Sequence, residues 1–197
     1  MLPSALGMGV RQMPGLEHPP RGFPRGAEIR PLGIDDFPAV RYLHANVLRA
    51  QTAEALSEGE IAAFANLVHS PAYSDLLREE NEIFSAWLAG ELLGTAAWRI
   101  SADDGTSARI GFVFARHSGF GIGSRLVQEA EGRAMTWGFE RLTSFTTLNA
   151  VTFFQKLGYT VVSHGVKVLS PDCALPVAFL TKRLARRHRP NPSTQAH

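Results

Sequence analysis

Six residues in the middle of the chain form a glycine-rich loop that is suited to holding an anion. The run is Gly119, Phe120, Gly121, Ile122, Gly123 and Ser124, and it leads into a helical pattern. Glycine has no Cβ, so backbone N–H groups can converge on a phosphate there. A helix that begins at such a loop adds the positive end of its dipole. The loop is therefore a candidate pyrophosphate site, although a purely structural turn explains the glycines equally well.

Three kinds of phosphate loop compete for this run. A Walker loop needs Lys and then Ser or Thr after its second glycine, but here Arg125 follows Ser124 and the spacing differs. A dinucleotide G-x-G-x-x-G fingerprint needs a third glycine where the chain has Leu126 or Ser124. That loop would also open a βαβ array, whereas this one follows a strand meander. The third kind of loop is one that binds the pyrophosphate of coenzyme A.

A second motif lies downstream of the loop. It reads Asn149, Ala150, Val151, Thr152, Phe153, Phe154, Gln155, Lys156, Leu157, Gly158, Tyr159. Together with residues 109–134, this run resembles the two signature regions of the GNAT superfamily of N-acetyltransferases, in particular small bacterial members of unassigned substrate. The resemblance covers roughly residues 27–184. It implies acetyl-CoA as co-substrate and an acetyl transfer to a primary amine.

The resemblance also implies which residues hold the cofactor. The family motif Arg/Gln-x-x-Gly-x-Gly/Ala fits best with Ser118 in its first position; a shifted register starting at Arg116 also matches the letters. The strand around Phe112 and Val113 would hydrogen-bond the pantetheine, with the Val113 amide as oxyanion donor. The full implied set is Phe112, Val113, Ser118, Gly119, Phe120, Gly121, Ile122, Gly123, Ser124, Asn149, Phe153 and Lys156.

The proton-transfer groups match the family less well. Phe154 occupies the position where the family often has a tyrosine that protonates the leaving thiolate, and phenylalanine carries no proton to donate. A general base should have a pKa near the working pH. Glu82 is the base candidate that we carry forward, and His44 and His117 are further candidates. These departures keep an alternative open, a catalytically silent acyl-CoA-binding or sensor module.

Periodicity places these motifs in an α+β fold. A strand at 28–32 precedes a helix after Asp36, a helix after the capping box at 57–60 and a short helix after Pro71. A meander follows at 83–88, 92–100 and 109–115, then the loop and its helix, a strand at 142–147, a short helix at 149–157 and two closing strands. We expect a mixed, mostly antiparallel sheet of about six to seven strands with helices on both faces, and a parallel strand pair around the loop.

The ends of the chain differ from its middle. Residues 1–26 are rich in proline and glycine and predict a disordered leader or a mis-assigned start; residues 185–197 predict a disordered basic tail. Between them, the acetyltransferase-like domain at 27–184 carries 14 basic and 17 acidic residues, so the sequence pI near 9.0 belongs to the ends. This distribution argues against nucleic-acid binding.

Further expectations concern partners and location. There is one cysteine, Cys173, and no apolar run of about 18 residues, so we expect no disulfide, no metal site and no membrane span. The N-terminus is a poor signal peptide, which favours the cytoplasm. A homodimer is common in the family. The acceptor is a small-molecule or peptide amine, and an acidic domain would suit a cationic one. Aromatic residues able to line its groove are Tyr42, His44, Phe64, Trp87 and Trp98.

Overall fold

Seven strands form one continuous sheet. The computed structural model describes residues 22–184. The strands are β1 (Glu28–Pro31), β2 (Glu82–Leu88), β3 (Glu91–Ile100), β4 (Ala108–Ala115), β5 (Arg141–Thr146), β6 (Thr160–Ser170) and β7 (Cys173–Arg183). Their order across the sheet is β1-β2-β3-β4-β5-β7-β6, and β4 and β5 run parallel while the other pairs are antiparallel. The predicted mixed sheet with one parallel pair is confirmed.

Five helices connect the strands, and the expected start signals open several of them. They are α1 (Phe37–Gln51), α2 (Glu58–His69), α3 (Pro71–Arg78), α4 (Ile122–Thr136) and α5 (Val151–Lys156), with short 3-10 turns at Ile34–Asp36 and Leu148–Ala150. At the start of α2, Ser57 accepts a hydrogen bond from the Glu60 amide while the Glu60 carboxylate accepts one from the Ser57 amide. This reciprocal pair is the capping box that the sequence predicts.

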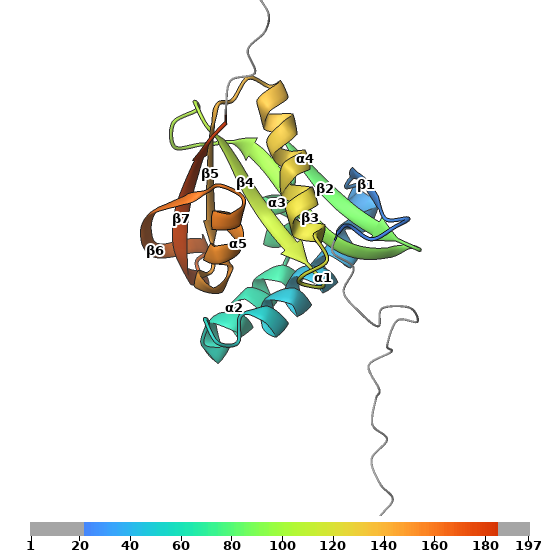
Figure 1. Cartoon of the computed structure of the whole chain (residues 1–197). Coiled ribbons are helices and arrows are strands. Elements are labelled where there is room, and N and C mark those ends of the chain that lie inside the picture. The colour runs from blue at the N-terminus through green and yellow to red at the C-terminus, as the bar shows by residue number, and fades with distance from the viewer. Residues whose placement is uncertain (1–21, 185–197) are drawn as a thin grey trace, which may run out of the picture.

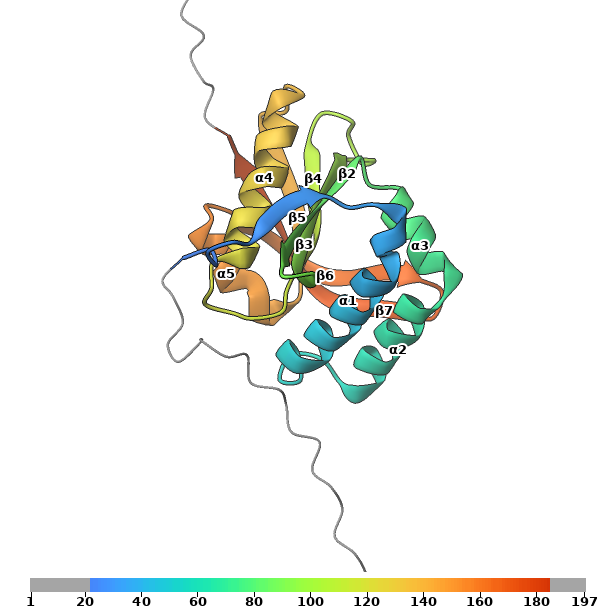
Figure 2. The same cartoon turned by 90° about the vertical axis from the view of Figure 1, so that its right-hand side faces the viewer.

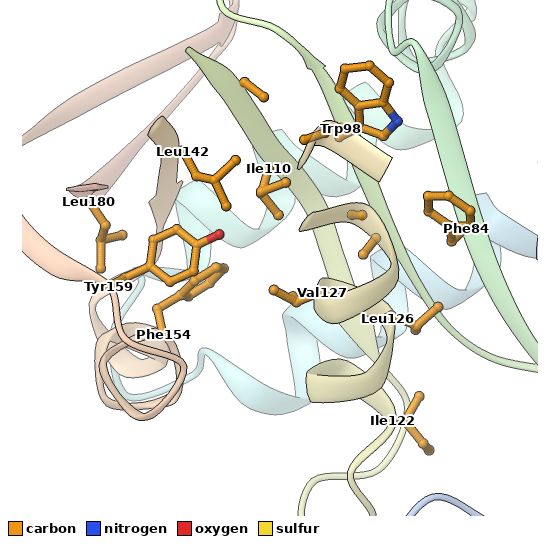
Figure 3. Close-up of a cluster of buried hydrophobic side chains, with 14 of the residues drawn as sticks. Phe84, Trp98, Ile110, Ile122, Leu126, Val127, Leu142, Phe154, Tyr159 and Leu180 are labelled. Atoms are coloured by element: carbon orange, nitrogen blue, oxygen red, sulfur yellow. The ribbon is translucent and has the colours of Figure 1, made fainter. Parts of the chain in front are cut away.

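The helices cover both faces of the sheet and create two separate cores. Helices α4 and α5 lie on one face, and α1, α2 and α3 lie on the other (Figures 1 and 2). Trp98 and Ile110 of the sheet belong to the same core as Leu126 and Val127 of α4 (Figure 3), and the Trp98 ring lies near the C-terminal end of the helix, 5.7 Å from the Trp137 ring. Neighbouring residues of a strand point to opposite faces, so Leu92 and Leu93 enter different cores. The strand β3 is buried on both sides because of this arrangement.

The parallel pair opens partway along its length. Backbone pairing between β4 and β5 joins Ala108 to Leu142, Arg109 to Thr143 and Ile110 to Ser144, and it ends there. The remaining five residues of β4 therefore present their backbone to a gap instead of a neighbouring strand. An unpaired edge of this kind offers N–H and C=O groups to an extended ligand.

The terminal segments lie largely outside the described residues. Of the predicted leader, residues 22–26 form turns, and Phe23 packs against the core beneath α4. The predicted tail at 185–197 falls outside the description altogether. Within residues 22–184, every helix is too short or too polar to cross a membrane.

Candidate functional site

A bulge in β4 lies where the sheet opens. Thr95 of β3 is opposite Phe114, and Ala97 is opposite Gly111, so two residues of β4, Phe112 and Val113, face a single residue of β3. Phe112 has a φ of 48°, in the left-handed region that bulky residues rarely adopt. Bulges re-aim backbone groups and are frequent beside active sites. This one turns the two residues expected to hold the acyl group out of the regular ladder.

The glycine loop leads from the end of β4 into α4. Gly119 and Gly121 have φ values of 86° and 69°, which glycine adopts without strain. The helix begins at Ile122 directly after Gly121, as the register starting at Ser118 requires. A Cβ on Gly123 would lie 3.2 Å from the Phe153 ring, so a glycine there lets α4 approach α5. The first N–H groups of α4 have no partner within the helix and are available to an anion.

A cavity of about 350 Å³ adjoins the bulge on the face covered by α1, α2 and α3. Both sides of the opened strand pair contribute to its wall, as do the helices. Representative wall residues are Phe64, Tyr73, Val113, Phe114, Thr146 and Asn149. A small molecule inside it would meet the bulge from the side opposite α4. The cavity thus lies beside the part of β4 that is not paired with β5, and β4 leads on into the glycine loop.

A buried hydrogen-bond chain supports the bulge from α1. The ring of His44 is fully buried, with Nδ1 2.6 Å from the Tyr73 hydroxyl and Nε2 2.7 Å from the Thr95 hydroxyl. Thr95 in turn donates to the carbonyl oxygen of Phe112 over 2.7 Å. The His44 ring stacks on Phe114 with 3.9 Å between the ring centroids. The chain therefore links α1, α3 and β3 to the strained residue of β4.

The direction of each hydrogen bond in this chain follows from the carbonyl group of Phe112, which lies at one end of the chain. A carbonyl oxygen only accepts, so the single hydroxyl proton of Thr95 goes to Phe112. Thr95 must then accept from the Nε2–H of His44, and Nδ1 accepts from the Tyr73 hydroxyl. Burial lowers the pKa of His44 to about 3 and raises that of Tyr73 well above its usual value. Both groups stay neutral, and His44 is too weakly basic to act as a general base near neutral pH.

Charged side chains occupy another part of the cavity wall. Glu80 is buried and accepts a hydrogen bond from Arg109, while Arg99 bonds Glu79 over 2.7 Å. Burial raises the pKa of Glu80, and the nearby guanidinium groups of Arg109 and Arg99 oppose that rise. Sequence reasoning missed this group, because nothing in the linear order of these residues indicates that they meet.

The structure brings several of the predicted residues together. Phe112, Val113, Asn149 and Phe154 line the cavity. The Asn149 side-chain amide donates to the carbonyl oxygen of Gln51 over 2.6 Å, at the mouth between α1 and the end of β5. Phe154 is 2% exposed and packs edge-on against its aromatic neighbours, so the position is filled by a ring without a hydroxyl.

Other predicted residues lie away from the cavity wall. Glu82 forms an ion pair of 3.1 Å with Arg133 of α4, on the opposite face of the sheet. His117 is exposed beside the glycine loop, with its ring against Phe120. Lys156 is exposed at the end of α5. This placement separates Glu82 from the bulge, and a base role for it stays an untested expectation that the geometry does not favour.

Of the five aromatic residues expected near the acceptor, one lines the cavity. Phe64 does so, whereas Tyr42 is 63% exposed and Trp98 is buried under α4. His44 lies behind the cavity wall, where it is hydrogen-bonded to the hydroxyl of the wall residue Tyr73. Tyr73 itself was not anticipated; its position after Pro71 on a short helix with apolar neighbours was the available signal.

The chain was compared with known proteins. A family model described as the acetyltransferase (GNAT) family matches residues 45–159. No curated protein matches. Among solved structures, a GCN5-related N-acetyltransferase from Rhodopseudomonas palustris is 24% identical with a TM-score of 0.71, and the match covers 80% of this chain and 95% of that one.

Two further structures were solved with their cofactors. The PaiA N-acetyltransferase of Thermoplasma acidophilum, in complex with coenzyme A, is 18% identical, with a TM-score of 0.60 and coverage of 80% and 98%. The putative acetyltransferase YncA of Salmonella typhimurium, with acetyl-CoA, is 16% identical, with a TM-score of 0.55 and coverage of 84% and 98%. These likenesses concern the fold. With the family model matching more than half of the sequence, the chain belongs to the acetyltransferase (GNAT) family of acyltransferases.

Proposed function

We propose that the protein transfers an acetyl group from acetyl-CoA to the primary amine of a small molecule or peptide. The observation that carries this proposal is the bulge at Phe112 and Val113, which lies at the opening of β4 from β5 and between the glycine loop and the cavity. The residues present fit the cofactor: an unpaired strand edge for the pantetheine arm, and the unpartnered amides at the start of α4 for the pyrophosphate.

The transfer asks little of the protein beyond positioning. The neutral amine attacks the thioester carbon, a C–N bond forms and the C–S bond breaks, and the amine loses a proton while the thiolate gains one. The Val113 amide would stabilise the negative charge on the carbonyl oxygen. The cavity would hold the amine beside the thioester and exclude water. Because Phe154 offers no proton, the departing thiolate would take its proton from water or from the positively charged nitrogen that the attack creates.

Calorimetry with acetyl-CoA tests cofactor binding. We expect saturable binding by the wild type and loss of binding by Gly121→Glu, which places a carboxylate at the start of α4. Gly105→Glu is the control: Gly105 has a comparable φ of 61° and lies in the turn between β3 and β4, at the opposite end of β4 from the loop. Absence of binding by the wild type at millimolar acetyl-CoA would refute the proposal.

A silent acyl-CoA-binding module is the second candidate, and Phe154 is the observation that favours it. Thiol release with a broad panel of amines separates the two functions. Robust thiol release with any amine excludes the silent module, whereas cofactor binding without thiol release for every amine tested supports it. Location in the cytoplasm, a homodimer and the absence of a nucleic-acid partner stay predictions; sedimentation of the full chain with and without DNA tests the last two.

A further inference from the structure

Five charged side chains line the cavity, and we call them the cluster. Among the described wall residues, three are cationic (Arg99, Arg109 and Lys167) and two are anionic (Glu79 and Glu80). The domain as a whole has an excess of acidic residues, so this wall has the opposite sign to its surroundings. An acidic domain suggested a cationic acceptor, but the local charge near the acyl site favours an anion.

Three polar atoms of the cluster are buried without a partner among residues 22–184. The Glu80 side chain is 0% exposed; its Oε1 accepts from Arg109 and lies 3.8 Å from Nε of Arg99, while its Oε2 has no hydrogen bond. The Nε atoms of Arg99 and Arg109 are also buried and unpartnered. Buried polar atoms are nearly always satisfied by protein, water or ligand. These three atoms are closed off from the cavity, so a ligand would meet the more exposed parts of the two guanidinium groups, whose side chains are 21% and 16% exposed for Arg99 and Arg109.

The guanidinium of Arg109 lies close to the acyl site. A Cβ built on Gly111 would be 3.8 Å from Nε and 3.9 Å from Nη2 of Arg109, so the side chain lies over Gly111. Val113 is two residues farther along β4, a separation of roughly 7 Å along a strand. Lys167 approaches the same region from β6: its Nζ lies 5.4 Å from the centre of the Phe145 ring, and Cζ of Arg109 lies 5.6 Å from that centre.

Lys167 adds a charge that the protein itself does not neutralise. It is half-buried, and within residues 22–184 no carboxylate lies within ion-pair distance of it. Its contact with the Phe145 ring places it beside the same ring as Arg109, and both side chains line the cavity. Two cations beside one aromatic ring repel each other, and an anion bound in the cavity reduces that repulsion.

We propose that this cluster binds the carboxylate of the acetyl acceptor, so that the acceptor is an amino acid. The inference rests on the proposed acetyl transfer. A hydrogen bond of about 3 Å between Arg109 and the carboxylate leaves about 4 Å of the span between Gly111 and Val113 for the rest of the acceptor, because the Val113 amide is taken by the thioester oxygen. One to three carbon atoms between amine and carboxylate fill that distance. The carboxylate would lie against the cationic groups of Arg109 and Lys167, while Glu80 holds the Arg109 guanidinium from behind.

The test compares free L-amino acids with the corresponding L-amino-acid amides as acceptors. Each pair keeps the amine and the side chain and exchanges the carboxylate for a neutral carboxamide. Thiol release is followed at saturating acetyl-CoA, and kcat/KM is expressed per neutral amine because the two amines differ in pKa. We expect the acid to be preferred at least about tenfold, the size expected of one charge-assisted hydrogen bond. Equal or better turnover of the amides overturns the proposal.

A charge-removing pair of variants assigns the preference to the cluster. Lys167→Gln should lower the acid-to-amide ratio about tenfold, whereas Arg183→Gln, an exposed loss of one charge at the end of β7 outside the cavity wall, should leave the ratio unchanged. Arg109 is a poorer first target because its removal leaves the buried Glu80 without its hydrogen bond, with only the longer contact to Arg99. An unchanged ratio in Lys167→Gln contradicts the role of Lys167.

Failure of this inference can be told apart from failure of the proposed function. If acetyl-CoA does not bind, the acetyl transfer itself is refuted. If acetyl-CoA binds but neither member of any pair is acetylated, calorimetry of N-acetyl amino acids and N-acetyl amino-acid amides on the coenzyme A complex decides. Tighter binding of the acids supports the carboxylate site, and equal or absent binding overturns it.

Discussion

The hydroxyl of Thr95 donates a 2.7 Å hydrogen bond to the carbonyl of Phe112, the residue at which β4 leaves its regular conformation. A left-handed φ on a bulky residue costs on the order of 1–3 kcal/mol and persists only when the surroundings compensate for it. Here the compensation comes from His44 and Tyr73 through a fully buried chain. We infer that this chain holds the bulge, and with it the Val113 amide, in one orientation.

Replacing Thr95 by valine should test that role. Valine has nearly the same shape but leaves the Nε2–H of His44 and the carbonyl of Phe112 without their partner, which should cost about 1–3 kcal/mol in the free energy of unfolding. If the bulge is then less well ordered, kcat should fall about tenfold while the KM for acetyl-CoA changes little. Urea unfolding and steady-state kinetics measure both. Thr95→Ser keeps the hydroxyl and should retain kcat; a full-rate Thr95→Val enzyme would contradict the positioning role.

The buried His44 should also make stability depend on pH. Its pKa is about 3 in the folded protein against 6.5 for an ordinary histidine, so below pH 6.5 the unfolded chain binds a proton that the folded chain does not. Stability should therefore fall as the pH decreases from 6.5 towards 3, by up to about 1.4 kcal/mol per pH unit from this residue. The measurement is the urea midpoint across this range in the wild type and in His44→Phe. Subtracting the two profiles cancels the contributions of Glu80, Asp36 and Asp104, and parallel profiles would disprove the assignment.

Local sequence signals predicted the elements and the cofactor side of the site. Three signals each determine where the helix that follows them begins: the capping box before α2, the proline at the start of α3 and the glycines before α4. Because each acts on residues close to it in sequence, its effect can be predicted without knowing the tertiary structure. The resemblance placed Phe112 and Val113 at the acyl group, and the structure shows a bulge at those two residues.

The acceptor side was not predictable from the sequence because it depends on register between strands. Arg99 and Arg109 are partners across β3 and β4, and Glu80 reaches both from the turn after α3. A slip of one residue in that pairing would send the arginines to opposite faces of the sheet. The position of Glu82 depends on the same alternation: it lies on β2, and its side chain forms an ion pair with Arg133 of α4, on the face opposite the cavity.

Gly94 provides a test of how closely β3, β4 and α4 pack. A Cβ there would lie 2.7 Å from the carbonyl oxygen of Phe114 and 2.9 Å from the Ile122 side chain, and the first of these is backbone that cannot move aside easily. Gly94→Ala should therefore lower the free energy of unfolding by about 1–3 kcal/mol. Gly132→Ala is the matched control on α4, where a Cβ meets nothing within 4 Å. Because alanine favours a helix, the control should gain up to about 1 kcal/mol in the free energy of unfolding. If Gly94→Ala is as stable as the wild type, this packing is contradicted.

Asn149 joins the two sides of the cofactor opening, and its removal should weaken cofactor binding. Its side-chain amide donates to the carbonyl of Gln51, whose own side chain donates to the carbonyl of Ala115 over 2.9 Å. These contacts link the end of α1 to β4 and to the segment after β5, the two borders of the gap.

Asn149→Ala loses one hydrogen bond at this border and should raise the Kd for acetyl-CoA about two- to tenfold, by the net value of such a bond. Asn46→Ala removes an equivalent exposed contact, from the Asn46 side chain to the carbonyl of Tyr42, and should leave the Kd unchanged. Titration calorimetry compares the three proteins. Equal Kd values for wild type and Asn149→Ala would show that this residue closes the opening of the free protein without taking part in holding the cofactor.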